Sequence, residues 1–188
     1  MRRDEATFVR ELTEAQKSAA KLEPAIQPLY ELLKRGEVDR AKESVPRWQA
    51  AFDLALGRVL AIKVRTEAYN GMLARAKRGM KVADPQHNTW HLEPSDEIQL
   101  GSQLKSHAAK AREYLERVAG EHGGTPWAWL AQRELKEPLG WEWKELRTPL
   151  DPPAPRVAAA ASNPPRAPSD ERPRMIRRPP PRRPPPKL

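Results

Sequence analysis

Residues 102–143 read SQLKSHAAKAREYLERVAGEHGGTPWAWLAQRELKEPLGWEW, and they decide the fold because they predict two helices joined by a sharp turn. Small and apolar residues recur at helical spacing in the first helix until the Gly123-Gly124 pair, which ends it. Thr125 and Pro126 then begin the second helix as its N-cap and first helical residue, and Pro138 ends it. The apolar positions are Ala108, Ala111, Leu115, Val118 and Ala119 in the first helix, and Trp127, Leu130, Ala131 and Leu135 in the second.

This pattern predicts a helical hairpin over residues 102–137. The small residues of its first helix allow the second helix to approach closely, and Trp127 and Trp129 are expected to fill the seam. Beyond the hairpin, Trp141 and Trp143 share one face if their segment is extended, because side chains alternate along a strand. Two interpretations follow for these rings: they seal the open end of the hairpin, or they stack on a ligand or partner.

The chain before the hairpin predicts further helices. Residues 4–22 and 26–33 carry apolar side chains at helical spacing, and the Glu23-Pro24 pair separates the two helices. Gly36 stands in a C-cap position, so LLKRGEVDRAKES predicts a helix, a tight turn at Gly36-Glu37 and another helix.

The longest apolar stripe in the chain covers residues 46–77. It predicts a helix of about 50 Å, with Gly57 and Asn70-Gly71 as the places where it bends or breaks. Residues 80–101 then lose the helical period and predict a long loop with one short extended piece at 89–92. Trp90 and Leu92 are the expected anchors of this loop on the helices.

The positive charge of the chain is concentrated near its end. The net charge is +9, and residues 151–188 hold nine Lys/Arg against three Asp/Glu, so +6 lies there and +3 in the first 150 residues. The segment from residue 147 onward is rich in Pro and Arg and poor in large apolar residues, which predicts a disordered basic tail over 147–188 after a helical domain over 1–146. PPPRRPPP favours polyproline II locally.

The composition excludes several kinds of site and several classes of protein. Cysteine is absent, which excludes disulfides, thiolate metal sites and a cysteine nucleophile. No apolar run approaches the ~20 residues that span a membrane. The start, MRRDEATF, turns acidic at once and lacks an apolar stretch, so it does not predict a signal peptide. We expect a cytoplasmic protein.

The sequence offers few candidate residues for metal binding, catalysis or partner binding. His87 and His91 lie four residues apart near Asp84 and Glu93, but that spacing joins metal ligands only on a helix, and the surrounding sequence predicts a loop. We therefore predict no metal site, no cofactor and no catalytic residue. For partner binding, the candidates are two tryptophans and four tail arginines: Trp141, Trp143, Arg177, Arg178, Arg182 and Arg183.

Two resemblances can be stated. The run AREYLERVAGEHGGTPWAWLAQREL resembles a tetratricopeptide-type helical hairpin, and LYELLKRGEVDRAKES resembles a second one more weakly, without the steady period of about 34 residues that joins such repeats. Residues 45–146, with GRVLAIKVRTEAYN, NTWHL, GSQLK, GTPWAWLAQREL and PLGWEW in that order, are similar to a helical C-terminal region of planctomycete proteins that carry a von Willebrand factor A domain. That domain and its Asp-x-Ser-x-Ser metal motif are absent from this chain, so metal-dependent adhesion is not implied.

The sequence thus predicts an all-α bundle of tetratricopeptide-like helical hairpins followed by a disordered tail. The expected function is a non-enzymatic protein-interaction or scaffold module that binds through a helix groove or the tail. The alternative is sequence-independent binding of nucleic acid or another polyanion through the tail arginines. A scaffold requires a groove or an exposed apolar patch on the helical body.

Overall fold

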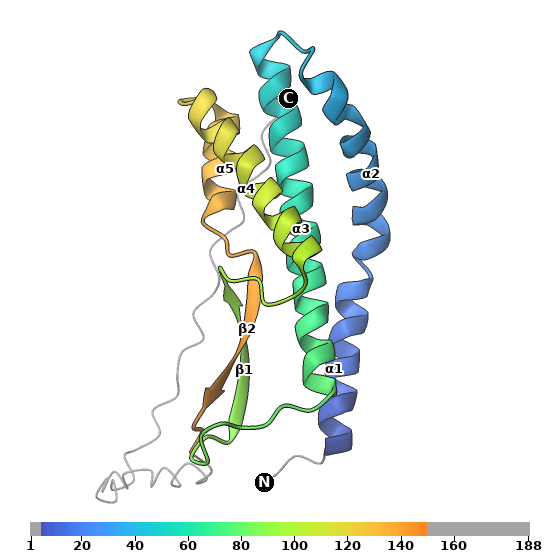
Figure 1. Ribbon diagram of the computed structural model, residues 1–188, viewed down its shortest axis with the longest axis vertical. Helices are drawn as coiled ribbons and strands as arrows, with labels where there is room; N and C mark the ends of the chain where they lie inside the picture. Colours follow the sequence, from blue (N-terminus) through green and yellow to red (C-terminus); the bar gives the residue numbers. More distant parts are fainter. Residues whose placement is uncertain (1–4, 150–188) are drawn as a thin grey trace, which may run out of the picture. The chain divides into compact units, whose positions relative to one another are not determined.

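The computed structural model describes residues 5–149, and seven helices and strands follow one another along them (Figure 1). In chain order these are α1 (Glu5–Ala20), α2 (Glu23–Arg40), α3 (Pro46–Lys77), β1 (Thr89–Ser95), α4 (Ser102–Glu121), α5 (Pro126–Leu135) and β2 (Gly140–Leu146). The predicted helical character is confirmed, and a small sheet of two strands is added to it. Most of the predicted tail, including all four of its candidate arginines, lies outside the described residues.

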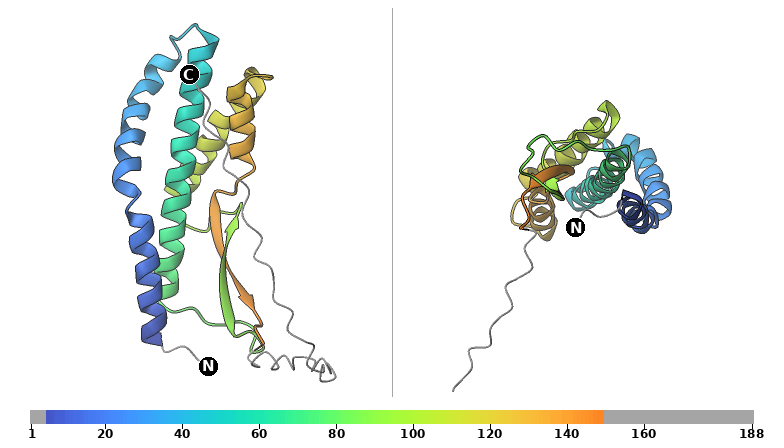
Figure 2. Two further views of the ribbon diagram at one scale, coloured as in Figure 1. Left: turned by 180° about the vertical axis from the view of Figure 1, so that it is seen from behind. Right: turned by 90° about the horizontal axis from the view of Figure 1, so that it is seen from below.

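Helix α3 is the element against which the others pack. It contacts α1, α2, α4, α5 and β2. Figures 1 and 2 show α1 and α2 following each other along one side of α3, while α4, α5 and the sheet cover another side. The helix runs without interruption through Gly57 and Gly71, so the break considered from sequence does not occur. None of the helices between residues 5 and 149 is long and apolar enough to cross a membrane.

Three apolar clusters form the core, and each joins α3 to different neighbours. The largest joins α2, α3 and α4 around Leu60, Val64 and Tyr114. A second joins α3 to the α4–α5 hairpin around Leu115 and Val118. The third joins α1 and the sheet to the end of α3; its members include Leu12, Leu73, Ala76, Leu92 and Trp143. This third cluster places both strands beside the C-terminal end of α3.

The predicted turn at Gly36-Glu37 is wrong, because α2 continues through it to Arg40. Gly36 lies against α3 instead: a Cβ atom there would lie 2.9 Å from Cε2 of Phe52. A glycine in the middle of a helix resembles a C-cap in sequence, yet here it lets two helices approach closely. The weaker of the two tetratricopeptide-like hairpins therefore does not exist as predicted, and α2 pairs with α3.

The predicted hairpin at the centre of the sequence is confirmed as α4 and α5. The Thr125 hydroxyl accepts a hydrogen bond from the Ala128 amide at 3.3 Å, as expected of an N-cap, and Pro126 is the first residue of α5. Trp127 packs against the second apolar cluster. Trp129 does not fill the seam: its side chain is 60% exposed, and the Arg133 guanidinium lies 5.9 Å from its ring centre.

Strands β1 and β2 pair antiparallel, with Leu92 opposite Trp143 and Pro94 opposite Trp141. Directly opposed residues share a face, so Trp141 and Trp143 do lie on one face, together with Trp90 and Leu92. The Trp141 indole donates a hydrogen bond to the Arg65 carbonyl at 3.2 Å, and the Trp143 indole donates one to the Met72 carbonyl at 3.0 Å. These bonds hold the sheet against two successive stretches of α3.

Candidate functional site

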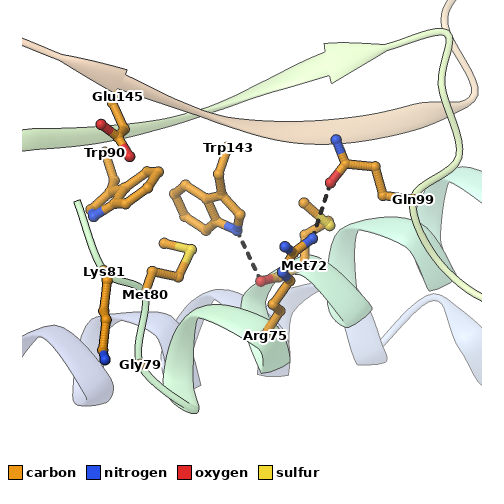
Figure 3. A pocket seen from close by; sticks show the side chains of 9 residues that line it. All are labelled: Met72, Arg75, Gly79, Met80, Lys81, Trp90, Gln99, Trp143 and Glu145. Carbon is orange, nitrogen blue, oxygen red and sulfur yellow. Dashed lines mark hydrogen bonds between the residues drawn. The ribbon is translucent and has the colours of Figure 1, made fainter. Parts of the chain in front are cut away.

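A cavity of about 380 Å³ lies between the end of α3 and the inner face of the sheet (Figure 3). We call it the tryptophan groove. Its lining comes from α3, from the segment after α3, from the segment between β1 and α4, and from both strands; the residues are Met72, Arg75, Gly79, Met80, Lys81, Trp90, Gln99, Trp143 and Glu145. Separate stretches of the chain therefore build one site.

The chain is brought to this site by the end of α3 and the turn that follows it. The amides of Arg78 and Gly79 donate to carbonyls of the last helical turn, and Gly79 has a positive φ of 93°, which ends the helix. Met80 and Lys81 follow directly and lie below the tryptophans in Figure 3. The site thus follows from where the helix stops.

The two tryptophans of the groove differ in how they are held. Trp143 has its indole nitrogen bonded to the Met72 carbonyl, so its ring is fixed on α3. Trp90 is half-buried, and its indole nitrogen has no hydrogen-bond partner within residues 5–149. Figure 3 shows the two rings side by side with the Met80 side chain below them. Trp90 is therefore the ring of the pair with a polar group still free to bind.

Positive charge lines one side of the groove. Arg75 donates to the Gln99 side-chain oxygen at 3.0 Å, and neither Arg75 nor Lys81 forms an ion pair with a carboxylate in the described part of the chain. The one carboxylate of the lining, Glu145, is already engaged: it accepts from the Ala83 amide at 2.8 Å and the Asp84 amide at 3.2 Å. These backbone bonds lower the pKa of Glu145, with His87 contributing further.

The tryptophans predicted from sequence are only partly in the site. Trp143 lines the groove, whereas Trp141 lies beside Tyr69, with ring centres 5.2 Å apart and planes at 65°. With its indole bonded to Arg65, Trp141 serves to attach the sheet to α3. Trp90 was predicted only as a loop anchor, and the structure places it in the lining of the groove. The extended TWHL segment was the signal that could have identified it.

The two histidines do not come together on a shared carboxylate. His87 Nδ1 lies 3.3 Å from Glu145 and its Nε2 lies 3.9 Å from Asp84. His91 is on the outer face of β1, with Nδ1 3.7 Å from Glu93. His87 thus positions Glu145 at the edge of the groove, while His91 belongs to the exposed face of the sheet.

Sequence reasoning missed a buried ionic cluster elsewhere. Asp53 is fully buried in α3. Arg40 of α2 donates hydrogen bonds to its carboxylate from Nη2 at 2.6 Å and from Nε at 3.1 Å. Arg117 of α4 adds a third contact at 3.7 Å. The cluster ties three helices together, and the hydrogen bond to Asp53 raises the pKa of Arg40 further. A lone Asp inside an apolar helical stripe was the available signal.

A second fixed arginine supports the route from α5 to β2. Arg65 of α3 donates to the Pro138 carbonyl at 2.9 Å and to the Glu137 carbonyl at 3.1 Å, and it pairs with Glu134. Arg65 also donates to the Glu134 carbonyl in the last turn of α5 at 3.4 Å, and a cation bonded there stabilises the end of the helix. Because β2 begins at Gly140, this contact directs the strand that carries Trp143.

No family model, curated protein or solved structure matches the chain. The resemblance of residues 45–146 to the region beside von Willebrand factor A domains therefore stays a prediction.

Proposed function

We propose that this chain is a non-enzymatic protein-interaction module that binds a partner polypeptide in the tryptophan groove. The observation that carries the proposal is the position of Trp90. Its ring lines a cavity of about 380 Å³ at the protein surface, and its indole nitrogen has no partner between residues 5 and 149. Tryptophan is among the residues most enriched at the energetic centres of protein interfaces, where it fills well-packed hollows.

The contrast with the neighbouring tryptophans supports this assignment. Trp141 and Trp143 each donate their indole hydrogen to a carbonyl of α3, as buried tryptophans usually do. Trp90 contributes no such bond to the described fold. A large side chain that is only half-buried and makes no hydrogen bond within the described fold suits a contact surface.

The chemistry of the lining favours binding over catalysis. Glu145 is the carboxylate that lines the cavity, and its two backbone amide donors keep its pKa low. An efficient general base needs a pKa near the working pH and an oxygen free to receive a proton. Glu145 meets neither condition, so a role in shaping and charging the site is the better assignment.

The tetratricopeptide-like description applies to one hairpin in this proposal. Ala108 and Ala111 of α4 and Ala131 of α5 are buried, and such small residues permit close helix packing. Helices α4 and α5 are thus the part that we propose as tetratricopeptide-like. A tandem array is not proposed, since α2 is a single helix where a second hairpin was predicted.

The proposal is tested by selecting short peptides on the full-length chain from a displayed random library. Each selected peptide is then measured against Trp90→Ala and against Trp129→Ala as the matched control, because Trp129 is an exposed tryptophan on α5. We expect peptides whose affinity falls at least about tenfold with Trp90→Ala and is unchanged with Trp129→Ala. Peptides that bind both variants equally, or a selection without enrichment, would contradict the proposal.

The alternative function, polyanion binding through the tail, has its own test. Replacing Arg177, Arg178, Arg182 and Arg183 by Gln in the full chain removes four positive charges. If the chain binds duplex DNA in a salt-dependent way and this variant does not, the alternative is supported. Unchanged binding, or no binding by the original chain, would remove it.

A further inference from the structure

The tryptophan groove continues beyond Trp90 into a second hollow. This hollow has a volume of about 220 Å³ and shares Gly79, Met80 and Trp90 with the first. Its other walls are apolar residues of α1 and α3, namely Phe8, Val9 and Ala76, together with Lys77. Trp90 thus lines both a hollow that reaches toward Trp143 and one that reaches toward α1. A ligand filling both would be long and would contact Trp90 in each.

The cations around this double site lack negative partners. Arg75 and Lys81 line the first hollow, and neither forms an ion pair within residues 5–149. Glu145 is the one carboxylate of that lining, and the Ala83 and Asp84 amides already donate to it. The groove therefore presents positive charge that the described fold does not neutralise.

From these observations, and resting on the proposed function above, we infer that the partner segment is an acidic peptide in an extended conformation. Two of its apolar side chains occupy the two hollows that share Trp90, and its carboxylates lie against Arg75 and Lys81. Charge complementarity of this kind selects the partner and speeds its association. The free indole nitrogen of Trp90 is available to a peptide carbonyl.

The spacing of the two anchors follows from the geometry of an extended chain. Side chains in van der Waals contact with opposite sides of one aromatic ring are about 7 Å apart, because each contact spans about 3.5 Å. Residues i and i+2 of an extended chain are separated by nearly the same distance, at about 3.4 Å per residue, and point the same way. The recognised motif is therefore an apolar residue, any residue and a second apolar residue, with Asp or Glu on either side.

Single-stranded nucleic acid is the competing occupant, since it also pairs aromatic rings with cations. One feature favours the peptide. The second hollow has apolar walls from Phe8, Val9 and Ala76, which suit an aliphatic or aromatic side chain.

The test uses three short peptides with the same Leu-x-Phe core and flanks that are acidic, amide or basic. Their affinities for the full-length chain are measured by fluorescence anisotropy at low and high salt. We expect the acidic peptide to bind at least about tenfold more tightly than the amide peptide at low salt, with a smaller ratio at high salt. An oligothymidylate probe is measured alongside.

Charge reversal locates the effect. Arg75→Glu combined with Lys81→Glu should abolish the preference for the acidic peptide, whereas Lys105→Glu should preserve it, because Lys105 is an exposed residue of α4 that does not line the groove. Thermal melting of each variant shows whether it is folded. If the double variant is not folded, the single variant Lys81→Gln is measured in its place. A preference that survives either groove variant would contradict the inference.

The outcomes separate the inference from the function on which it rests. If the amide peptide binds as tightly as the acidic one and Trp90→Ala weakens both, the inference of an acidic partner is wrong. The proposed function, peptide binding in the tryptophan groove, is then still supported. If no peptide binding depends on Trp90, both are overturned. If oligothymidylate binds more tightly than the acidic peptide and depends on Trp90, the peptide is replaced by nucleic acid.

Discussion

At the scale of single residues, the stability of this fold depends on a few buried polar contacts. Asp53 has no exposed surface, whereas its partner Arg40 retains 18% side-chain exposure. This asymmetry decides which partner is costlier to remove, because a charge left behind is penalised in proportion to its burial. Without Arg40, the buried Asp53 keeps only the more distant contact with Arg117 and has no exposed surface to hydrate, whereas Arg40 without Asp53 can reach solvent.

We therefore predict that Arg40→Ala destabilises the protein by about 3–5 kcal/mol and that Asp53→Ala costs less, about 2–3 kcal/mol. The free energy of unfolding in urea measures both. Asp39→Ala is the matched control, because Asp39 pairs with Lys42 at the surface and should matter by at most about 0.5 kcal/mol. Equal losses for Arg40→Ala and Asp53→Ala would show that the burial asymmetry has no energetic weight.

Glu37 of α2 makes the stability of the fold depend on pH in the acidic range. Burial alone would raise its pKa, but hydrogen bonds from Lys110 and Tyr114 of α4 outweigh burial and lower the pKa below its ordinary value of 4.5. Burial and the same contact raise the pKa of Tyr114. A carboxyl with a lowered folded pKa stabilises the fold above pH 4.5, and this contribution is lost as the pH falls below that value through the folded pKa.

Glu37→Gln should accordingly cost about 1–2 kcal/mol at neutral pH and progressively less below pH 4.5. Urea unfolding of both chains across this range measures the difference. A cost that stays constant down to the most acidic conditions would mean that the ionised form of Glu37 contributes nothing.

At the scale of elements, local signals in the sequence predicted helix starts and strands but not what the glycines do. The N-cap at Thr125 was predictable because the bond it makes reaches only three residues ahead. The roles of Gly36 and Gly57 were not predictable, since each of these glycines packs against a helix that is distant along the chain. A Cβ atom on Gly57 would lie 2.9 Å from Cγ of the buried Leu115 in α4.

Glycine-to-alanine changes should consequently have opposite signs at two helical positions. A Cβ atom added to Gly120 of α4 would meet no atom within 4 Å, so Gly120→Ala should stabilise by up to about 1 kcal/mol through helix propensity. Gly57→Ala should destabilise by about 1–3 kcal/mol, because the buried Leu115 has no room to move. Thermal denaturation of the two variants measures both shifts, and a rise for Gly57→Ala would contradict the close packing of α3 on α4.

The sheet shows the same limit of local reasoning. One extended piece was expected at residues 89–92, and the segment around Trp141 and Trp143 was only considered as extended, but the pairing of the two was not expected. The strands are separated by α4 and α5, and only the folded positions of those helices bring Leu92 opposite Trp143. Without the pairing, the groove could not be foreseen, although one of its tryptophans had been named.

At the scale of the whole molecule, residues 5–149 form a helical unit in which α3 supports the groove. The end of α3 supplies Arg75 and the turn to Met80, and its carbonyls hold the strand that bears Trp143. The expectation of a helix groove for a partner is thus replaced by a more specific proposal, a groove between a helix and a two-stranded sheet. The sequence could not show this groove because its walls come from separated stretches of the chain.

The most direct test of peptide binding at Trp90 is nuclear magnetic resonance of the tryptophan indole groups in the full-length chain. The protein has six tryptophans, so each indole N–H gives its own signal after assignment by substitution. On addition of the acidic Leu-x-Phe peptide, we predict that the Trp90 signal shifts most and that those of the exposed Trp48 and Trp129 stay in place. A spectrum in which Trp90 does not move, or in which Trp48 or Trp129 moves instead, would contradict binding in the tryptophan groove.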